Sequence, residues 1–217
     1  SYPHSSQSRC WSAGMPGAGR STPFPAALGC ASASGLDRGT WETGGCIGGP
    51  GTLFSLPLIQ IRRITTSDPL YAQEVALRDS VLLQPIGLDV AKLQGLFPGL
   101  EEQAEHFVAV FDHPAGPRVI GTALLLPNHP KTGIGKLMQM TVDPQRQGEG
   151  IGTRLVVAIE RRAFGEIGLD EIFCHARDTA LGFYSSLGWT FDSDTFMEAG
   201  IPHRRMLFAN SPAEQEM

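Results

Sequence analysis

The sequence lacks any apolar run approaching the roughly 18 residues that a membrane-spanning helix needs; Leu124–Pro127 is typical of how soon each run ends. It also lacks an excess of basic residues, because 17 Lys and Arg against 22 Asp and Glu give a formal charge of −5. That balance argues against the basic surface that non-specific nucleic-acid binding requires. Apolar residues make up 41% of the 217 positions, which excludes a chain disordered from end to end. We expect a soluble globular protein with one sizeable core and neither a membrane nor a nucleic acid as partner.

Cysteine is scarce as well, with four residues in the chain. Cys10, Cys30 and Cys46 precede the first periodic segment, and their spacing matches neither a zinc site nor a redox pair. Cys174 stands in an apolar stretch and is predicted to be a small buried residue. No metal is predicted, and a reducing, cytoplasmic location fits this usage best.

The first 51 residues contain 11 Gly, 5 Pro and 8 Ser but only five charged residues. Such a segment buries too little apolar surface to offset its backbone entropy, so we expect a disordered extension over 1–56. The absence of acidic residues before Asp37 is shared with organelle transit peptides, yet no amphipathic face is present, which favours a plain extension. A folded domain is predicted over 57–209, followed by a short tail at 210–217.

The periodic part of the chain begins with a strand at 58–64 and a helix that starts after Asp68-Pro69 and ends at Pro85 and Gly87. A short helix at 88–96 precedes a predicted hairpin, 107–111 with 119–126. The next strand, 136–142, alternates so that Met138, Met140 and Val142 share one face.

Helices and strands then alternate to the end of the domain. The sequence predicts a helix at 151–163, a strand at 171–175, a helix at 180–187 capped by Asp178, and strands at 190–192 and 203–208. The fold class is therefore α/β (α+β), with a mixed sheet and helices on both of its faces.

The stretch from Val142 to Gly152 carries most of the chemical information. A strand ends there, a short turn follows, and glycines lead directly into a helix, whose first turn has free N–H groups and a positive dipole end. Glycines let that backbone approach an anion closely, which favours a phosphate- or pyrophosphate-binding loop. Glycines at 148, 150 and 152 fit neither a P-loop nor the G-x-G-x-x-G fingerprint. An ordinary strand-to-helix turn is the alternative interpretation.

The pattern Gln147-x-x-Gly150-x-Gly152 after Val142-x-Pro144 resembles the acyl-CoA signature of the GCN5-related N-acetyltransferase (GNAT) superfamily. That resemblance implies a GNAT fold with a mostly antiparallel central sheet, acetyl-CoA as co-substrate, and an acyltransferase activity. In the family the CoA pyrophosphate sits on this loop, while the preceding strand lines the acetyl and pantetheine arm. The implied CoA-binding residues are Met140, Thr141, Val142, Gln147, Gly148, Glu149, Gly150, Ile151, Gly152 and Thr153.

Two further segments extend the resemblance to about 57–209. The segment Ala180–Trp189 looks like the family's downstream helix and turn. The segment Phe196–His203, together with Leu77-Arg78, is similar to the ElaA-like branch of these acetyltransferases. Glu149 departs from the neutral or basic residue often found at its position, so its side chain should face solvent and avoid repelling CoA.

The family resemblance also suggests roles for single residues. Tyr184 would protonate the CoA sulfur, although its place on the apolar stripe of the helix, taken alone, favours a core aromatic. The backbone N–H of Val142 is our candidate for polarising the acetyl carbonyl. Seven side chains are candidates for the base, and His203 is preferred because the Gly200–Pro202 turn aims it at the cleft. The seven are Glu101, Glu102, Glu105, His106, His175, Glu198 and His203.

Two of these, Glu101 and Glu102, form either a solvated pair at a helix end or an anionic wall that selects a cationic amine. We expect an acetyl-CoA-dependent N-acetyltransferase that acts on a primary amine by direct transfer in a ternary complex, with a homodimer allowed. Two alternatives stay open: a non-catalytic acyl-CoA-binding or scaffold module, and a protein that binds nucleotide phosphates on the same loop.

Overall fold

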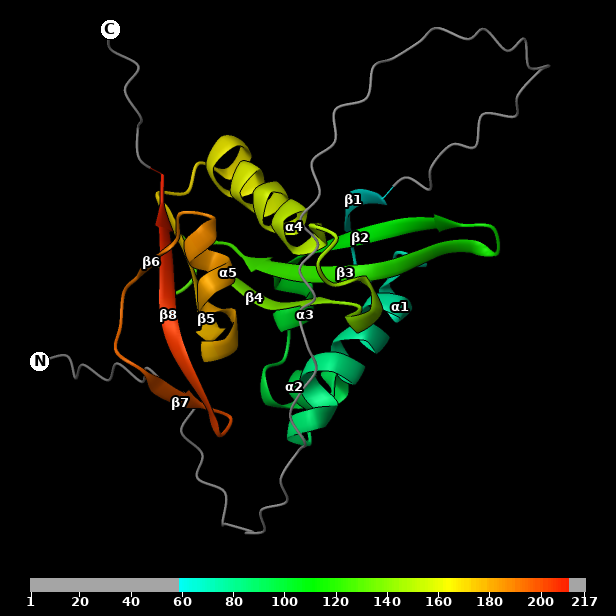
Figure 1. Cartoon of the computed structure of the whole chain (residues 1–217), viewed down its shortest axis with the longest axis horizontal. Helices are drawn as coiled ribbons and strands as arrows, with labels where there is room; N and C mark the ends of the chain where they lie inside the picture. Colours follow the sequence, from blue (N-terminus) through cyan, green and yellow to red (C-terminus); the bar gives the residue numbers. More distant parts are fainter. Residues whose placement is uncertain (1–58, 211–217) are drawn as a thin grey trace, which may run out of the picture. The chain divides into compact units, whose positions relative to one another are not determined.

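The computed structural model describes residues 59–210, so the predicted extension, the tail and the three early cysteines lie outside the described residues. The described part consists of one sheet with helices on both faces (Figure 1), as predicted. Its elements are β1 (Ile59–Ile64), α1 (Tyr71–Arg78), η1 (Asp79–Leu83), η2 (Gln84–Ile86), α2 (Val90–Leu96), α3 (Leu100–Gln103), β2 (Glu105–His113), β3 (Gly116–Leu126), β4 (Ile134–Val142), η3 (Pro144–Arg146), α4 (Ile151–Glu160), η4 (Arg161–Ile167), β5 (Glu171–Arg177), η5 (Asp178–Ala180), α5 (Leu181–Ser186), β6 (Thr190–Phe191), β7 (Phe196–Glu198) and β8 (Ile201–Ala209).

The sheet has eight strands in the order β1-β2-β3-β4-β5-β8-β6, and β7 pairs with β8 beside that path. Every pair is antiparallel except β4 with β5, which run parallel. The parallel pair is possible because α4 and η4 connect its two strands as a crossover. This topology confirms the mixed, mostly antiparallel sheet.

Strand β2 shows how the two faces of the sheet are filled. Phe107 and Ala109 belong to the main core under α4, whereas Val108 and Val110 pack with Ile64 on the α1 side. This division follows from the two-residue period of a strand.

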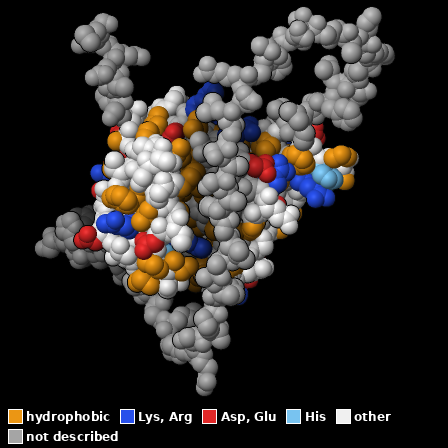
Figure 2. All heavy atoms as spheres, viewed as in Figure 1, with side chains coloured by type: hydrophobic (Ala, Val, Ile, Leu, Met, Phe, Trp, Pro, Cys, Tyr) orange, Lys and Arg blue, Asp and Glu red, His pale blue; other side chains and the backbone are white. Residues whose placement is uncertain are grey.

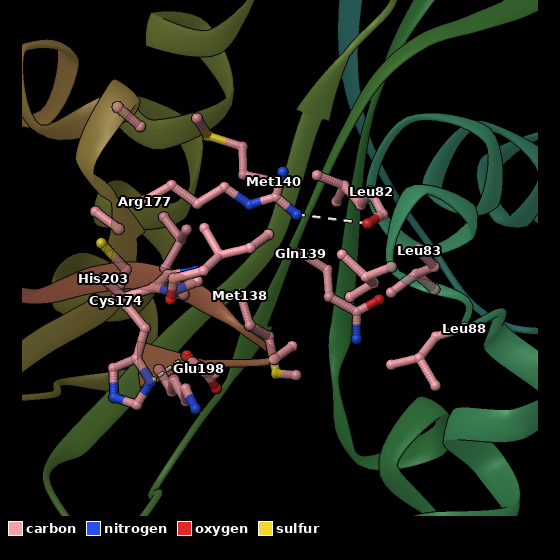
Figure 3. A pocket seen from close by; sticks show the side chains of 18 of the residues that line it. Leu82, Leu83, Leu88, Met138, Gln139, Met140, Cys174, Arg177, Glu198 and His203 are labelled. Carbon is pink, nitrogen blue, oxygen red and sulfur yellow. Dashed lines mark hydrogen bonds and ion pairs between the residues drawn. The ribbon is translucent and has the colours of Figure 1, made fainter. Parts of the chain in front are cut away.

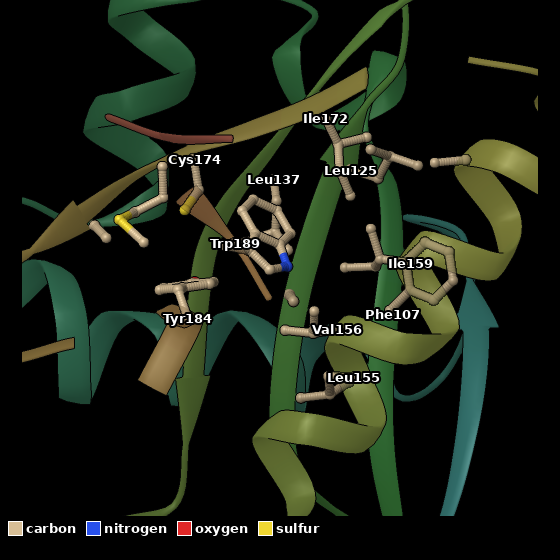
Figure 4. Packing of buried hydrophobic residues seen from close by; sticks show 14 of the residues in the cluster. Phe107, Leu125, Leu137, Leu155, Val156, Ile159, Ile172, Cys174, Tyr184 and Trp189 are labelled. Carbon is tan, nitrogen blue, oxygen red and sulfur yellow. The ribbon is translucent and has the colours of Figure 1, made fainter. Parts of the chain in front are cut away.

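Helix α4 buries the stripe that its sequence spacing predicts, namely Ile151, Leu155 and Ile159, against the sheet (Figure 4). Close approach requires Gly121 in β3, because a Cβ at that position would lie 2.9 Å from Ile151 Cγ2 and 3.2 Å from Leu155 Cδ1. The position of α4 is thus fixed by one glycine in the strand beneath it.

Most predicted elements are present, and the differences are local. The short helix α3 and the short strand β7 were not expected. The helix after β5 begins with η5 and has no side-chain cap from Asp178. The helix predicted before Pro85 widens into the π-helical η1 before it ends at Gly87, which has a left-handed φ of 76°.

The strand alternation predicted for 136–142 is wrong at its centre. Leu124 pairs with Met138 but Thr122 pairs with Thr141, so two residues of β4 oppose one residue of β3. The bulge contains Gln139, whose φ is 49°. Beyond it the faces exchange, so Val142 shares the face of Leu137, and Met138 shares the face of Thr141.

Among residues 59–210, no helix is both long and apolar enough to cross a bilayer. The face shown in Figure 2 carries side chains of both charge signs between apolar patches, and it shows no continuous basic surface. The view agrees with the acidic composition.

Candidate functional site

A cavity opens where β4 and β5 separate. The two strands pair only from Ile134 to Leu137 on β4 and from Glu171 to Cys174 on β5. The bulge at Gln139 turns β4 away from its neighbour immediately beyond that point. A cavity of about 250 Å³ lies between the diverging strands, and its walls come from η1, η2 and α2 on one side and from β5, β7 and β8 on the other (Figure 3).

The glycine-rich loop lies between β4 and α4. Gly148 and Gly150 have φ values of 84° and 73°, a left-handed region that favours glycine, and nothing lies within 4 Å of a Cβ built on either residue. Gly150 is the N-cap of α4, and no side chain caps the first turn of that helix. The loop therefore presents backbone to open space at the positive end of a ten-residue helix.

Charged side chains around the loop leave that backbone accessible. Glu149 is exposed and accepts hydrogen bonds from Nε and Nη2 of Arg146 at 2.7 and 2.8 Å. The carboxylate is neutralised by its neighbour and faces solvent, as expected from the sequence. Arg146 in turn lies over the ring of Phe111, 4.6 Å from its centre.

Gly152 has a different reason to be glycine. A Cβ there would lie 3.3 Å from Cζ of Phe183 and 3.9 Å from Cε of Met140. The first turn of α4 therefore lies against α5 and the end of β4, beside the loop. The loop and the tyrosine helix meet at this point, which the sequence could not show.

The backbone of Val142 points into the gap between the strands. Asp143 N donates to Ile120 O across the β3–β4 ladder, at 2.9 Å. Bonded and non-bonded pairs alternate in an antiparallel ladder, so the neighbouring pair, Val142 with Gly121, is non-bonded. The N–H of Val142 thus points away from β3, toward the side on which β5 has separated. Thr141 is buried on the opposite face from Val142, and by the same alternation its backbone bonds to Thr122 of β3.

Tyr184 lies in the core and on the cavity wall at once. Its side chain is 4% exposed, its ring packs against Trp189, and its hydroxyl lies 3.8 Å from Sδ of Met140. Burial, together with its contact with Cys174, raises the pKa of Tyr184 well above its usual value, so the phenol stays protonated. Burial likewise raises the pKa of Cys174 to about 12. Both groups are neutral hydrogen-bond donors at neutral pH.

Two histidines line the wall of the cavity that β5, β7 and β8 form. His203 Nδ1 lies 2.8 Å from the carbonyl oxygen of Ile201, so that nitrogen carries a proton and donates it. His175 Nδ1 lies 2.9 Å from Oε2 of Glu198 on β7 (Glu198 is labelled in Figure 3). Burial alone would raise the pKa of Glu198, but the hydrogen bond from His175 and the charge of Lys136 hold it below its usual value. The His175–Glu198 pair depends on β7, which the sequence analysis missed.

The remaining base candidates are occupied elsewhere. Glu101 is 1% exposed and accepts from Arg78 Nη1 and Nη2 at 3.0 and 2.5 Å, so the expected solvated pair at a helix end is wrong for this residue. Glu102 is exposed and does not line the cavity. Glu105 accepts from Arg162 at 2.6 and 2.8 Å. Burial opposes its ionisation, yet those bonds hold the pKa of Glu105 below its usual value.

His106 belongs to a buried network rather than to the cavity. Its ring nitrogens face Oε1 of Glu74 at 3.3 Å and the carbonyl oxygen of Glu101 at 2.8 Å. Within the described part of the chain, Glu74, Glu101 and His106 form the one cluster with metal-ligand geometry. The guanidinium of Arg78 bonds both carboxylates, so an arginine already neutralises this donor set.

A family model described as an acetyltransferase (GNAT) domain matches residues 92–209. The chain is 29% identical to YyaT of Bacillus subtilis over 145 residues, which cover 67% of this chain and 92% of YyaT. It is 31% identical to the N-acetyltransferase YjcF of the same organism over 109 residues, covering 50% of this chain and 72% of YjcF.

Solved structures share the fold. An acyl-CoA N-acyltransferase from Pseudomonas aeruginosa superimposes with a TM-score of 0.56 at 19% identity, over 70% of this chain and 100% of that one. Escherichia coli ElaA superimposes with a TM-score of 0.52 at 17% identity, over 69% of this chain and 99% of ElaA.

Proposed function

The chain belongs to the GNAT acetyltransferase family and is an acyltransferase, and from that premise we propose that it transfers an acetyl group from acetyl-CoA to a primary amine. One observation supports this most: the uncapped first turn of α4 lies beside Met140, which lines the same cavity as Tyr184. We further propose direct transfer in a ternary complex, in a cytoplasmic enzyme.

The residues present fit acetyl-CoA. The backbone of 147–153 would bind the pyrophosphate, because glycine conformations and a helix N-terminus combine there without a blocking side chain. Met140 and Val142, on either side of Thr141, would line the pantetheine arm along the open edge of β4. When bound, acetyl-CoA supplies an activated thioester.

Three groups of this chain then act on the reaction. The N–H of Val142 would donate to the acetyl oxygen as it gains negative charge. The hydroxyl of Tyr184 would donate its proton to the departing sulfur. Because the pKa of Tyr184 is raised, the phenolate is disfavoured and must regain a proton in the same step. His203, the base that the sequence favours, also lines the cavity, with Nε2 as its acceptor nitrogen.

Direct transfer is favoured over an acetyl-enzyme intermediate. Cys174 is the one cysteine among the described residues, and a thiol with a pKa of about 12 forms almost no thiolate at neutral pH.

The test is release of CoA thiol from acetyl-CoA in the presence of small amines, amino acids and peptides. We expect amine-dependent thiol release together with an acetylated product of the amine. CoA binding without thioester consumption over the whole panel would support the non-catalytic binding module instead. Strong competition by ATP against CoA would support the nucleotide-phosphate alternative.

A further inference from the structure

We propose that the acceptor is a primary amine with an apolar carbon chain, and that His175, oriented by Glu198, takes the proton of its nitrogen. The inference rests on the proposed function, since it names the second substrate of the same cavity. It is carried by the division of the cavity into an apolar wall and a wall that holds the His175–Glu198 pair.

The apolar wall comes from the segment between α1 and α3. It consists of aliphatic side chains only, contributed by η1, η2, α2 and their connections: Leu82, Leu83, Ile86, Leu88, Leu93 and Leu100. No charged group of this segment lines the cavity, so nothing on this wall compensates a second charge on the acceptor. A flexible alkyl chain satisfies such a wall, whereas a polar or charged substituent loses hydration without gaining a partner.

The opposite wall supplies a base of defined geometry. The carboxylate of Glu198 is ionised and only accepts, so Nδ1 of His175 must donate across the 2.9 Å contact. In the neutral ring this places the lone pair on Nε2, and in the described part of the chain no group is hydrogen-bonded to that nitrogen. Phe196, 4.9 Å from the imidazole centre and nearly perpendicular to it, holds the ring from the side.

The cations of the cavity favour the reactive form of the amine. Burial lowers the pKa of Lys136, although Glu198 opposes that effect. Arg177 extends across the cleft and donates from Nη2 to the carbonyl oxygen of Leu82 at 3.4 Å (Figure 3). The burial that disfavours the ammonium of Lys136, together with the charge of Arg177, likewise disfavours an ammonium on the acceptor, so the acceptor binds as the neutral nucleophile.

In the proposed step the amine nitrogen attacks the thioester carbonyl carbon, so a C–N bond forms and the C–S bond breaks. The nitrogen's surplus proton passes to Nε2 of His175, and the sulfur leaves with the electron pair of the C–S bond. The sulfur gains a proton from Tyr184 or from solvent, and His175 returns its proton to solvent. Glu198 touches no reacting atom and acts as a positioning residue.

A series of linear amines from methylamine to hexylamine tests the apolar wall. We expect KM to fall about two- to fourfold for each added methylene, the range that burial of a CH₂ predicts. Leu88→Ala should raise KM for hexylamine about tenfold and leave methylamine nearly unchanged. Leu96→Ala is the matched control, because Leu96 is 61% exposed on α2 and should leave both values unchanged. A flat series, or faster acetylation of amino acids than of alkylamines, overturns the substrate class.

Variants of the pair test the base. His175→Ala should lower kcat about 100-fold, and added imidazoles should restore turnover in proportion to their basicity, which a purely structural role would not produce. Glu198→Gln should lower kcat about tenfold with little change in KM, and Glu198→Asp should recover part of the loss. His113→Ala, in the β2–β3 hairpin, is the control with unchanged kinetics. Wild-type kcat in His175→Ala with a folded protein overturns the assignment.

Calorimetric titration of acetyl-CoA separates the two levels of the account. If wild-type protein does not bind acetyl-CoA, the proposed function itself fails. If it binds acetyl-CoA and acetylates some amine, but shows neither the chain-length trend nor the His175 dependence, only the present inference fails.

Discussion

Tyr184 unites two interpretations that the sequence treats as rivals. Its ring belongs to the main core beside Trp189, and its hydroxyl lies on the cavity wall near Met140 and Cys174. The apolar stripe of α5 predicts the first role from residue spacing, whereas only the family resemblance suggests the second. Burial and catalysis are compatible here because burial keeps the phenol protonated.

We predict that Tyr184→Phe lowers kcat about 100-fold and leaves the Kd for acetyl-CoA within about twofold, since a donor to the leaving sulfur acts mainly in the transition state. Steady-state kinetics with calorimetry measure both quantities. Tyr71→Phe is the matched control, because its hydroxyl donates to Glu101 at 2.8 Å outside the cavity. Wild-type turnover in Tyr184→Phe would remove the hydroxyl from the mechanism.

The buried network joins α1, α3 and the sheet. Glu74 and Arg78 on α1 are fully buried, and Arg78 also donates to Oε1 of Gln139 at 2.9 Å. The network therefore connects α1 to the bulge of β4 beside which the cavity opens. A Glu–Arg pair at i and i+4 is more often a solvated pair on a helix surface, so the burial of Glu74 and Arg78 could not be predicted from their spacing.

His106 gives the network a pH dependence. Both ring nitrogens face oxygens that only accept, so the imidazole is doubly protonated. Burial opposes that charge, but the bonds to Glu74 and to the Glu101 carbonyl raise the pKa of His106 above its usual value. A raised folded-state pKa stabilises the protein fully below about pH 6.5, and the contribution is lost as the pH rises through the folded-state value.

We predict that His106→Gln lowers the free energy of unfolding by roughly 1–3 kcal/mol at pH 6, because it leaves buried partners without a charged donor. The loss should be smaller at pH 8.5, where the wild-type histidine contributes less. Urea unfolding at both pH values measures this, with His113→Gln, a half-buried position in the β2–β3 pairing, as the control. An equal loss at both values would contradict a charged His106.

The order and kind of most elements follow from the sequence, because their periodicity is strong. The stripe of α4 and the turns at Gly87 and Gly168 are examples. The bulge at Gln139 and the pairing of β7 do not follow, since both depend on contacts between distant segments. The loop could be predicted because it is one continuous segment. The pairing of His175 with Glu198 could not, because it joins two distant segments.

At the scale of the whole molecule, the main feature is the separation of the sheet into two parts at strands β4 and β5. Strands β1 to β4 form one part, β5 with β8, β6 and β7 forms the other, and the parallel β4–β5 pair joins them over only four residue pairs. Helix α4 packs on strands β1 to β4 (Figure 1), and its first turn lies beside Met140 near the end of β4. The cavity and the loop that we propose to bind the CoA pyrophosphate thus both adjoin Met140 of β4.

The most direct test is calorimetric binding of acetyl-CoA to wild type, Gly150→Val and Gly168→Val. Both glycines have a left-handed φ, 73° and 77°, and no atom lies within 4 Å of a Cβ built on either. Each variant should therefore lower the free energy of unfolding by a similar amount, about 1–2 kcal/mol. Only Gly150 lies in the loop, so we predict that Gly150→Val abolishes binding while folded Gly168→Val binds like wild type. Unchanged affinity in Gly150→Val would contradict the account.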